Sequence, residues 1–274
     1  MFGKLLKNDL KAQWHSTSVV LLCIIIVTAV AEIFAIVSDN QILGTLAGLL
    51  VLFILAFACI VMVITVSMLY SKTMFGRAGY LTLTIPAKTS SLVWSKTISG
   101  LVWIFTVFAL MIGSIFLWVS QVNDRFGEQV ASAEKLLSMF GAPSFSIIFI
   151  LVAIYVIYFA VAILLLVQCI YFGITLSNVK PFAKLGVLGA IIVTFASFFI
   201  ITTLTSSIAK ALPIGIILTE QNAVFTTDIV SSVQNLGSKV IFTENITGHL
   251  LCLATALALN VPITYLIKEK VNIK

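Results

Sequence analysis

The chain has 274 residues, of which 61% are hydrophobic and only 9% are charged, and its mean hydropathy is +1.18. A soluble domain needs a charged exterior, so this composition excludes one and predicts an integral membrane protein. The net charge of +6 lies in short basic segments between long neutral runs. We therefore attribute it to attraction by an anionic membrane leaflet and exclude nucleic acid as a partner.

Residues 2–14, within the first basic segment 1–18, predict an amphipathic helix at the membrane surface. Apolar and polar positions recur near a 3.6-residue period, and such a helix lies among the lipid headgroups. The alternative is a basic flank that only sets topology. The apolar face would hold Phe2, Leu5, Leu6, Leu10 and Trp14, and the other face Lys4, Lys7, Asn8 and Lys11.

Six neutral runs predict six transmembrane helices, because each reaches the ~20 residues that cross ~30 Å of hydrocarbon. We expect an all-α integral membrane fold with a single six-span domain over residues 1–274. A cleaved signal peptide is the rival interpretation of the first run, but that run continues past Ala31 to Val37. The runs are Val19–Val37, Ile42–Tyr70, Thr97–Ser120, Phe145–Ile174, Leu185–Ile208 and Gly248–Ile267.

The basic residues predict the orientation of these spans. If the N-terminus is cytoplasmic, twelve of the 16 Lys and Arg residues fall in the inner segments. This asymmetry places both termini in the cytoplasm. The inner segments are residues 1–18, 71–96, 175–184 and 268–274.

The two longer outer segments, residues 121–144 and 209–247, are patterned. The first predicts a helix over residues 126–140. The second predicts a helix over residues 225–240 that starts near Thr227 or Asp228. The apolar run Leu212–Leu218 is too short to span the membrane, and we expect it to enter the outer leaflet.

Sequence motifs of enzymes are absent. There is no HExxH, no GxSxG and no Walker A sequence, and the two histidines lie at opposite predicted membrane faces. The four cysteines lie inside predicted spans without metal-ligand spacing. We expect no catalytic residue, no metal site and no cofactor in this chain.

Glu32 is an acid at membrane depth, and the fifth span is rich in hydroxyl groups, among them Thr202 and Thr205. An ionisable residue in a span is by default a functional hypothesis, so these three residues are candidates for a substrate path. Alternatively, Glu32 reaches the outer headgroups and the hydroxyls bond to their own helix.

The inner loop over residues 71–96 carries the densest pattern. A glycine-bounded basic turn is followed by an alternating stretch and then by Pro86, which prevents simple continuation of a helix. Thr89 or Ser90 can cap the helix that leads into the third span. This loop is too patterned for a passive connector.

The loop resembles that of type-2 ABC transporter permeases in three features: Gly79-Tyr80-Leu81, Ile85-Pro86, and Leu92-Val93-Trp94-Ser95-Lys96. The resemblance implies a permease that dimerises with a second copy or a related chain and docks a separate ATPase, which holds ATP and Mg. It also implies that the docking residues are Gly79, Tyr80, Leu81, Pro86, Lys88 and Leu92.

We therefore expect a multi-pass permease subunit of an ABC exporter in a bacterial cell membrane. The apolar body and short outer loops favour an amphipathic peptide or a lipophilic drug as substrate, or immunity to such a compound. The alternative is an ATP-independent secondary transporter or channel, for which Glu32 is the main support.

Overall fold

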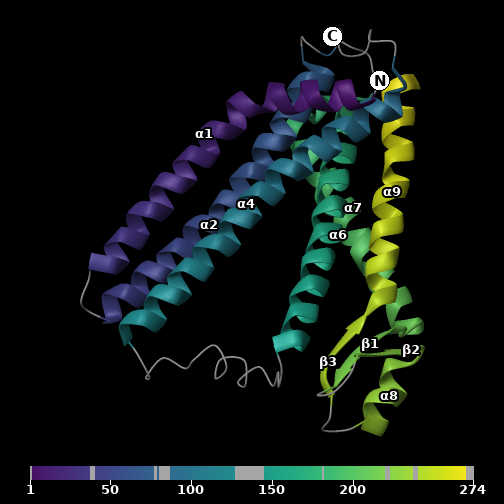
Figure 1. The fold of residues 1–274 in the computed structure, drawn as a ribbon. Helices are drawn as coiled ribbons and strands as arrows, with labels where there is room; N and C mark the ends of the chain where they lie inside the picture. Colours follow the sequence, from purple (N-terminus) through teal and green to yellow (C-terminus); the bar gives the residue numbers. More distant parts are fainter. Residues whose placement is uncertain are drawn as a thin grey trace. The chain divides into compact units, whose positions relative to one another are not determined.

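A computed structural model describes residues 2–37, 41–76, 79, 87–126, 145–180, 182–219, 223–236 and 240–269. Within these ranges, six helices are long and apolar enough to cross a membrane. This confirms six long apolar helices where the sequence predicts six spans. The helices are α1 (Phe2–Val37), α2 (Gln41–Phe75), α4 (Thr89–Phe126), α6 (Phe145–Ser177), α7 (Gly186–Ala211) and α9 (Ile246–Glu269) (Figure 1).

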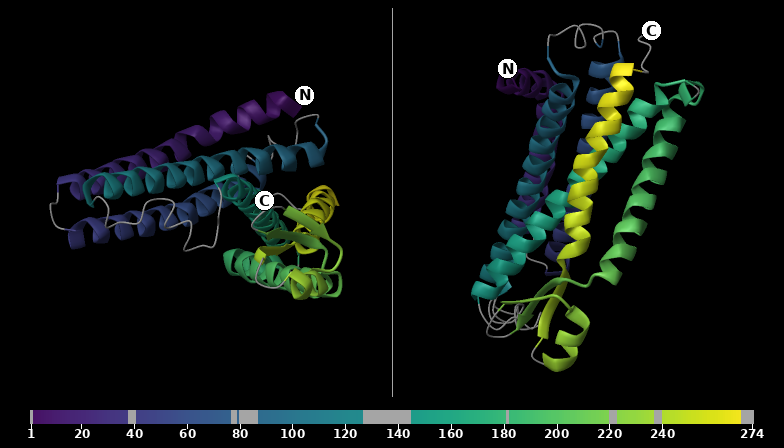
Figure 2. Two further views of the ribbon diagram at one scale, coloured as in Figure 1. Left: turned by 60° about the horizontal axis from the view of Figure 1, so that its bottom comes forward. Right: turned by 90° about the vertical axis from the view of Figure 1, so that its right-hand side faces the viewer.

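The helices divide into two compact units, Met1–Ser132 and Ala133–Asn272. In the first unit, α1, α2 and α4 pack pairwise and run side by side (Figures 1 and 2). Large apolar side chains fill the space between them. Met62, Val66, Val93, Ile104 and Val107 are all at most 1% exposed.

The expected surface helix over residues 2–14 does not form a separate element, because α1 is one continuous helix from Phe2 to Val37. The more buried face of its first turns matches the predicted apolar face only in part: Leu5, Leu6 and Leu10 are half-buried, but Phe2 and Trp14 are exposed. Gln13 is 7% exposed, whereas Trp14 is 59% exposed. Asp9 and Gln13 instead turn towards α4, where both find polar partners.

In the second unit, α6 packs closely on both α7 and α9, which contact each other less extensively. The contact with α7 centres on Gly173, where an added Cβ atom would overlap the Thr194 Oγ1 atom. The same Cβ would lie 2.7 Å from the carbonyl oxygen of Ala190. Leu165 and Cys169 of α6 form a core cluster with Ala256 of α9.

A three-stranded antiparallel sheet joins α7 to α9 and corrects the all-α prediction. Its strands are β1 (Gly215–Thr219), β2 (Ala223–Thr226) and β3 (Val240–Asn245), in the order β2-β1-β3. The run Leu212–Leu218 therefore supplies most of the central strand, whose backbone pairs on both sides. The sheet lies at the end of α9 (Figures 1 and 2).

Between β2 and β3 lies α8 (Ile229–Leu236), which is shorter than the predicted helix over residues 225–240. Phe225 belongs to β2 and Val240 to β3. The prediction of Asp228 at the helix start is confirmed, because the Val230 N–H donates to Asp228 Oδ1 over 3.0 Å. The other predicted outer helix, over residues 126–140, lies outside the described residues except for Phe126, the last residue of α4.

Candidate functional site

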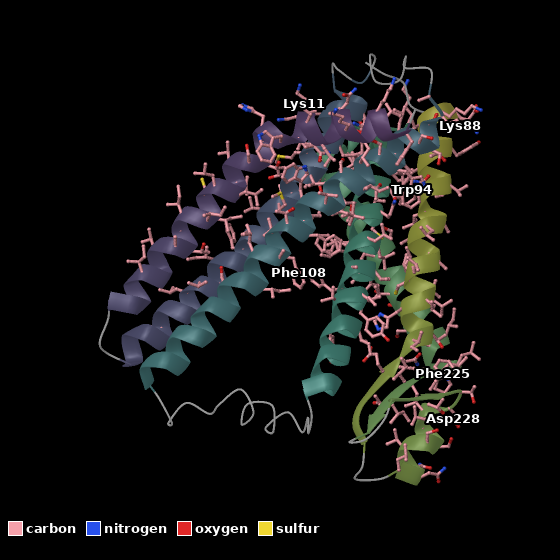
Figure 3. All side chains as sticks on the ribbon, in the orientation of Figure 1. Lys11, Lys88, Trp94, Phe108, Phe225 and Asp228 are labelled. Atoms are coloured by element: carbon pink, nitrogen blue, oxygen red, sulfur yellow. The ribbon has the colours of Figure 1, made fainter. Side chains whose placement is uncertain are left out.

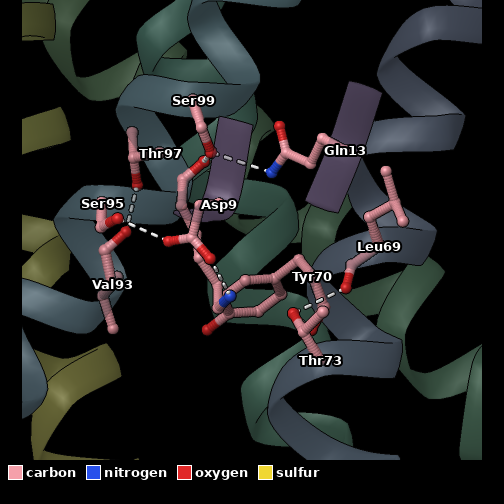
Figure 4. Close-up of polar contacts among 10 residues, drawn as sticks. Asp9, Gln13, Leu69, Tyr70, Thr73, Val93, Ser95, Thr97 and Ser99 are labelled. Carbon is pink, nitrogen blue, oxygen red and sulfur yellow. Dashed lines mark hydrogen bonds and ion pairs between the residues drawn. The ribbon is translucent and has the colours of Figure 1, made fainter. Parts of the chain in front are cut away.

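Polar side chains from the first turns of α1 meet others from the start of α4. We call this set the α1–α4 junction: Asp9, Gln13, Ser95, Lys96 and Ser99 (Figure 4). Residues four positions apart lie on the same side of a helix, one turn from each other. Asp9 and Gln13 therefore share one side of α1, and Ser95 and Ser99 share one side of α4. Two short patterns thus bring five polar side chains together across 86 residues of chain.

An ion pair lies at the centre of the junction. Lys96 Nζ is 2.9 Å from Asp9 Oδ1, and the two side chains are only 6% and 19% exposed. The Ser95 hydroxyl donates to the other carboxylate oxygen of Asp9. A charge that leaves water needs partners of this kind, so the junction holds α1 and α4 in one relative position.

A second layer of hydrogen bonds extends the junction along the two helices. Gln13 Nε2 donates to Ser99 Oγ over 2.8 Å, and Ser99 Oγ donates to the Lys96 carbonyl oxygen over 3.0 Å. The ring of Trp14 lies 5.5 Å from that of Trp103, centre to centre. The buried side chain of Tyr70, from α2, lies beside these residues (Figure 4).

The predicted docking residues that the structure describes divide into exposed and buried ones. Lys88 is exposed at the start of α4, and its carbonyl oxygen accepts from the N–H groups of Ser91 and Leu92. Lys88, rather than Thr89 or Ser90, thus immediately precedes the first helical residue. Leu92 is only 4% exposed. Figure 3 marks Lys88 at this end of α4.

Gly79, another predicted docking residue, lies in a tight turn after α2. Its N–H donates to the Gly76 carbonyl oxygen over 2.8 Å, and an added Cβ atom would overlap the Met74 carbonyl oxygen. The turn therefore requires glycine at this position. The remaining predicted docking residues, Tyr80, Leu81 and Pro86, lie outside the described residues.

The predicted path residues have ordinary helical partners where they are described. The Thr202 hydroxyl donates to the Phe198 carbonyl oxygen, and the Thr205 hydroxyl donates to that of Ile201. These bonds agree with the alternative interpretation, in which the hydroxyls bond to the backbone of their own helix. Glu32 belongs to α1, but its side chain lies outside the described part of the chain.

A second polar cluster, in the other unit, is one that the sequence did not reveal. His249 Nε2 lies 2.8 Å from Glu244 Oε1, and the His249 ring stacks on Tyr158 with a centroid distance of 3.6 Å. The side chains of His249 and Glu244 are 32% and 26% exposed. We call these three residues the sheet-end cluster, because they connect β3 and α9 with α6.

The signals for both clusters were weak. In the sequence, Asp9 differs from its neighbours only as the single acid among the first 31 residues, and its partner is far away in the chain. Glu244 and His249 are five residues apart, a spacing that brings them together only because a strand passes directly into a helix between them.

No group of three or more His, Cys, Asp or Glu side chains that could hold a metal ion occurs in the described ranges. Comparisons of the chain with protein-family models, with curated proteins and with solved structures find no match. The site must therefore be interpreted from its own residues.

Proposed function

We propose that this chain is the permease subunit of a bacterial ABC exporter, which a separate ATPase drives with ATP and Mg. Two copies, or this chain and a related one, would form the transmembrane pathway in the cell membrane. Both termini would face the cytoplasm, with the first turns of α1 at the membrane surface. The six apolar helices and the uneven distribution of Lys and Arg support this proposal.

The observation that carries the proposal is the way the α1–α4 junction supports the end of the 71–96 segment. A permease without its own nucleotide site must receive force through a protein contact. A contact transmits motion only if the residues behind it are held firmly. Leu92, Ser95 and Lys96 are all at most 4% exposed, and Asp9 binds the last two.

This arrangement refines the expected docking surface. The three residues that define the Leu-x-x-Ser-Lys pattern, Leu92, Ser95 and Lys96, are buried. They therefore pack inside the first unit and do not form its surface. The exposed Lys88 precedes them by one helical turn. Gly79 is also buried and would shape the turn after α2. We therefore assign the direct ATPase contact to the stretch that ends at Lys88 and the transmission of motion to residues 92–96.

The proposed substrate is an amphipathic peptide or a lipophilic drug, and removal of such a compound would give the cell immunity to it. Every predicted span is strongly apolar. A lipid-soluble or membrane-active molecule would be a suitable substrate for such an apolar transmembrane domain.

The test is to express the chain with an affinity tag in its own host and to measure which ATPase co-purifies. A variant carrying Tyr80→Ala and Pro86→Ala should lose the ATPase or its stimulation by substrate. The matched control carries Phe182→Ala and Lys184→Ala, two exposed positions in the other predicted inner segment. Normal assembly and stimulation in the Tyr80/Pro86 variant would refute the docking proposal.

A further inference from the structure

Three lysines form an exposed stripe along the first turns of α1. Lys4, Lys7 and Lys11 are all exposed, and steps of three and four residues keep them on one side of the helix. They span about 10 Å along the helix axis at 1.5 Å per residue. We call them the lysine stripe; Figure 3 marks Lys11.

The opposite side of the same turns holds the acid that would otherwise neutralise the stripe. Asp9 is the only acidic residue among the first 31, and Lys96 and Ser95 of α4 bind both of its carboxylate oxygens. Asp9 is five positions from Lys4 and two from both Lys7 and Lys11, which places it on the far side of a 3.6-residue helix. The exposed face therefore carries positive charge alone.

The stripe is continuous with an apolar surface of membrane type. The 36 residues of α1 extend about 54 Å, and the hydrocarbon core takes up only about 30 Å of that length. Trp14 is 59% exposed at the end of the stripe, and exposed aliphatic side chains such as Val19, Leu22 and Ile26 follow it. Lysine, then tryptophan, then aliphatic residues is the order that the headgroup region and the hydrocarbon favour.

We propose that the lysine stripe binds the phosphate groups of anionic lipids, so that the first turns of α1 form a lipid-binding surface. The lipid is favoured over an acidic protein partner because the stripe runs directly into the lipid-facing part of the same helix. The α1–α4 junction gives this binding a role: lipid held by α1 fixes Asp9, and through it the start of α4. The proposal does not depend on the permease function.

The test uses the purified full chain in vesicles of phosphatidylcholine that contain brominated phosphatidylglycerol or, in parallel, brominated phosphatidylcholine. Bromine quenches nearby tryptophan fluorescence, and subtraction of the signal of a Trp14→Phe variant isolates Trp14. At low salt, Trp14 should prefer phosphatidylglycerol. The relative binding constant should fall about fivefold for each lysine replaced by Gln, and should approach one in the triple variant.

A matched triple variant, Lys180→Gln, Lys184→Gln and Lys268→Gln, removes the same charge from exposed positions of the second unit and should keep the preference. Salt at about 1 M, where the Debye length is about 3 Å, should abolish the preference of the wild type. Quenching by brominated phosphatidylcholine checks that each variant is inserted. Equal quenching of the wild type by the two lipids, or an undiminished preference in the Lys4/Lys7/Lys11 variant, would overturn the proposal.

Discussion

The two units hold their helices together by different means. In the first, a buried ion pair between Asp9 and Lys96 joins α1 to α4. In the second, Gly173 lets α6 approach the backbone of α7 at Ala190. An ion pair fixes two helices at a single charged point, whereas a glycine contact lets two backbones come close over a small area.

The difference shows where each unit tolerates change. A buried ion pair depends on both partners, because removal of one leaves an uncompensated charge. A glycine contact depends on the absence of a side chain and fails when volume is added. The sheet-end cluster is a third case, because its Glu244–His249 contact is about one-third exposed and water can replace either partner.

The largest effect should come from breaking the buried pair. Lys96→Met leaves the Asp9 carboxylate without its cation, and we expect a loss of about 3–5 kcal/mol in the free energy of unfolding. Thermal unfolding of the purified chain in detergent measures this. The control is Lys88→Met, at an exposed position of the same helix start, which should stay within about 0.5 kcal/mol of the wild type.

A double variant sharpens this prediction. Asp9→Asn combined with Lys96→Met removes both charges and should recover a large part of the stability that Lys96→Met loses. A Lys96→Met chain as stable as the Lys88→Met chain would show that the pair contributes nothing to the first unit.

A smaller effect is expected in the second unit. Gly173→Ala places a methyl group against Thr194 and the Ala190 carbonyl, and should destabilise the chain by about 1–3 kcal/mol through overpacking. Gly113→Ala is the matched control in α4, since its Cβ atom would meet nothing within 4 Å. A Gly173→Ala chain as stable as the Gly113→Ala chain would exclude close α6–α7 packing, because both gain the same helix propensity.

The smallest effect should appear in the sheet-end cluster. A double-mutant cycle with Glu244→Gln and His249→Gln should give a coupling energy of about 0.2–1 kcal/mol, as is usual for partly exposed pairs. A coupling above about 2 kcal/mol would mean that this pair resembles the Asp9–Lys96 pair, and the contrast between the units would disappear.

Hydropathy was sufficient to predict the six long helices, because the length and apolar composition of each are contained in its own stretch of chain. The start of α8 was also predictable, since Asp228 bonds to the N–H group two residues later. Local signals of this kind are complete within a few residues. They can therefore be recognised in the sequence without knowledge of how the remainder of the chain folds.

The sheet and the α1–α4 junction were not predictable in this way. Strand β1 pairs Gly215 with Asn245, and the run Leu212–Leu218, which supplies most of this strand, is as free of charge as a membrane segment. Lys96 was counted with the inner cations that set the orientation, and nothing near it in the chain marks Asp9 as its partner. Both features depend on contacts between distant residues, which a local pattern does not encode.

The connection between β3 and α9 in the second unit is direct. Strand β3 ends at Asn245 and α9 begins at Ile246, without a linker, and Asn245 Nδ2 donates to the Ala209 carbonyl oxygen of α7 over 2.7 Å. There is therefore no linker to absorb a tilt of α9, and the tilt would pass directly to β3. Because α9 is about 36 Å long, a 10° tilt about its Glu269 end would carry the Ile246 end about 6 Å. The Asn245–Ala209 bond would then have to break, or α7 would have to follow.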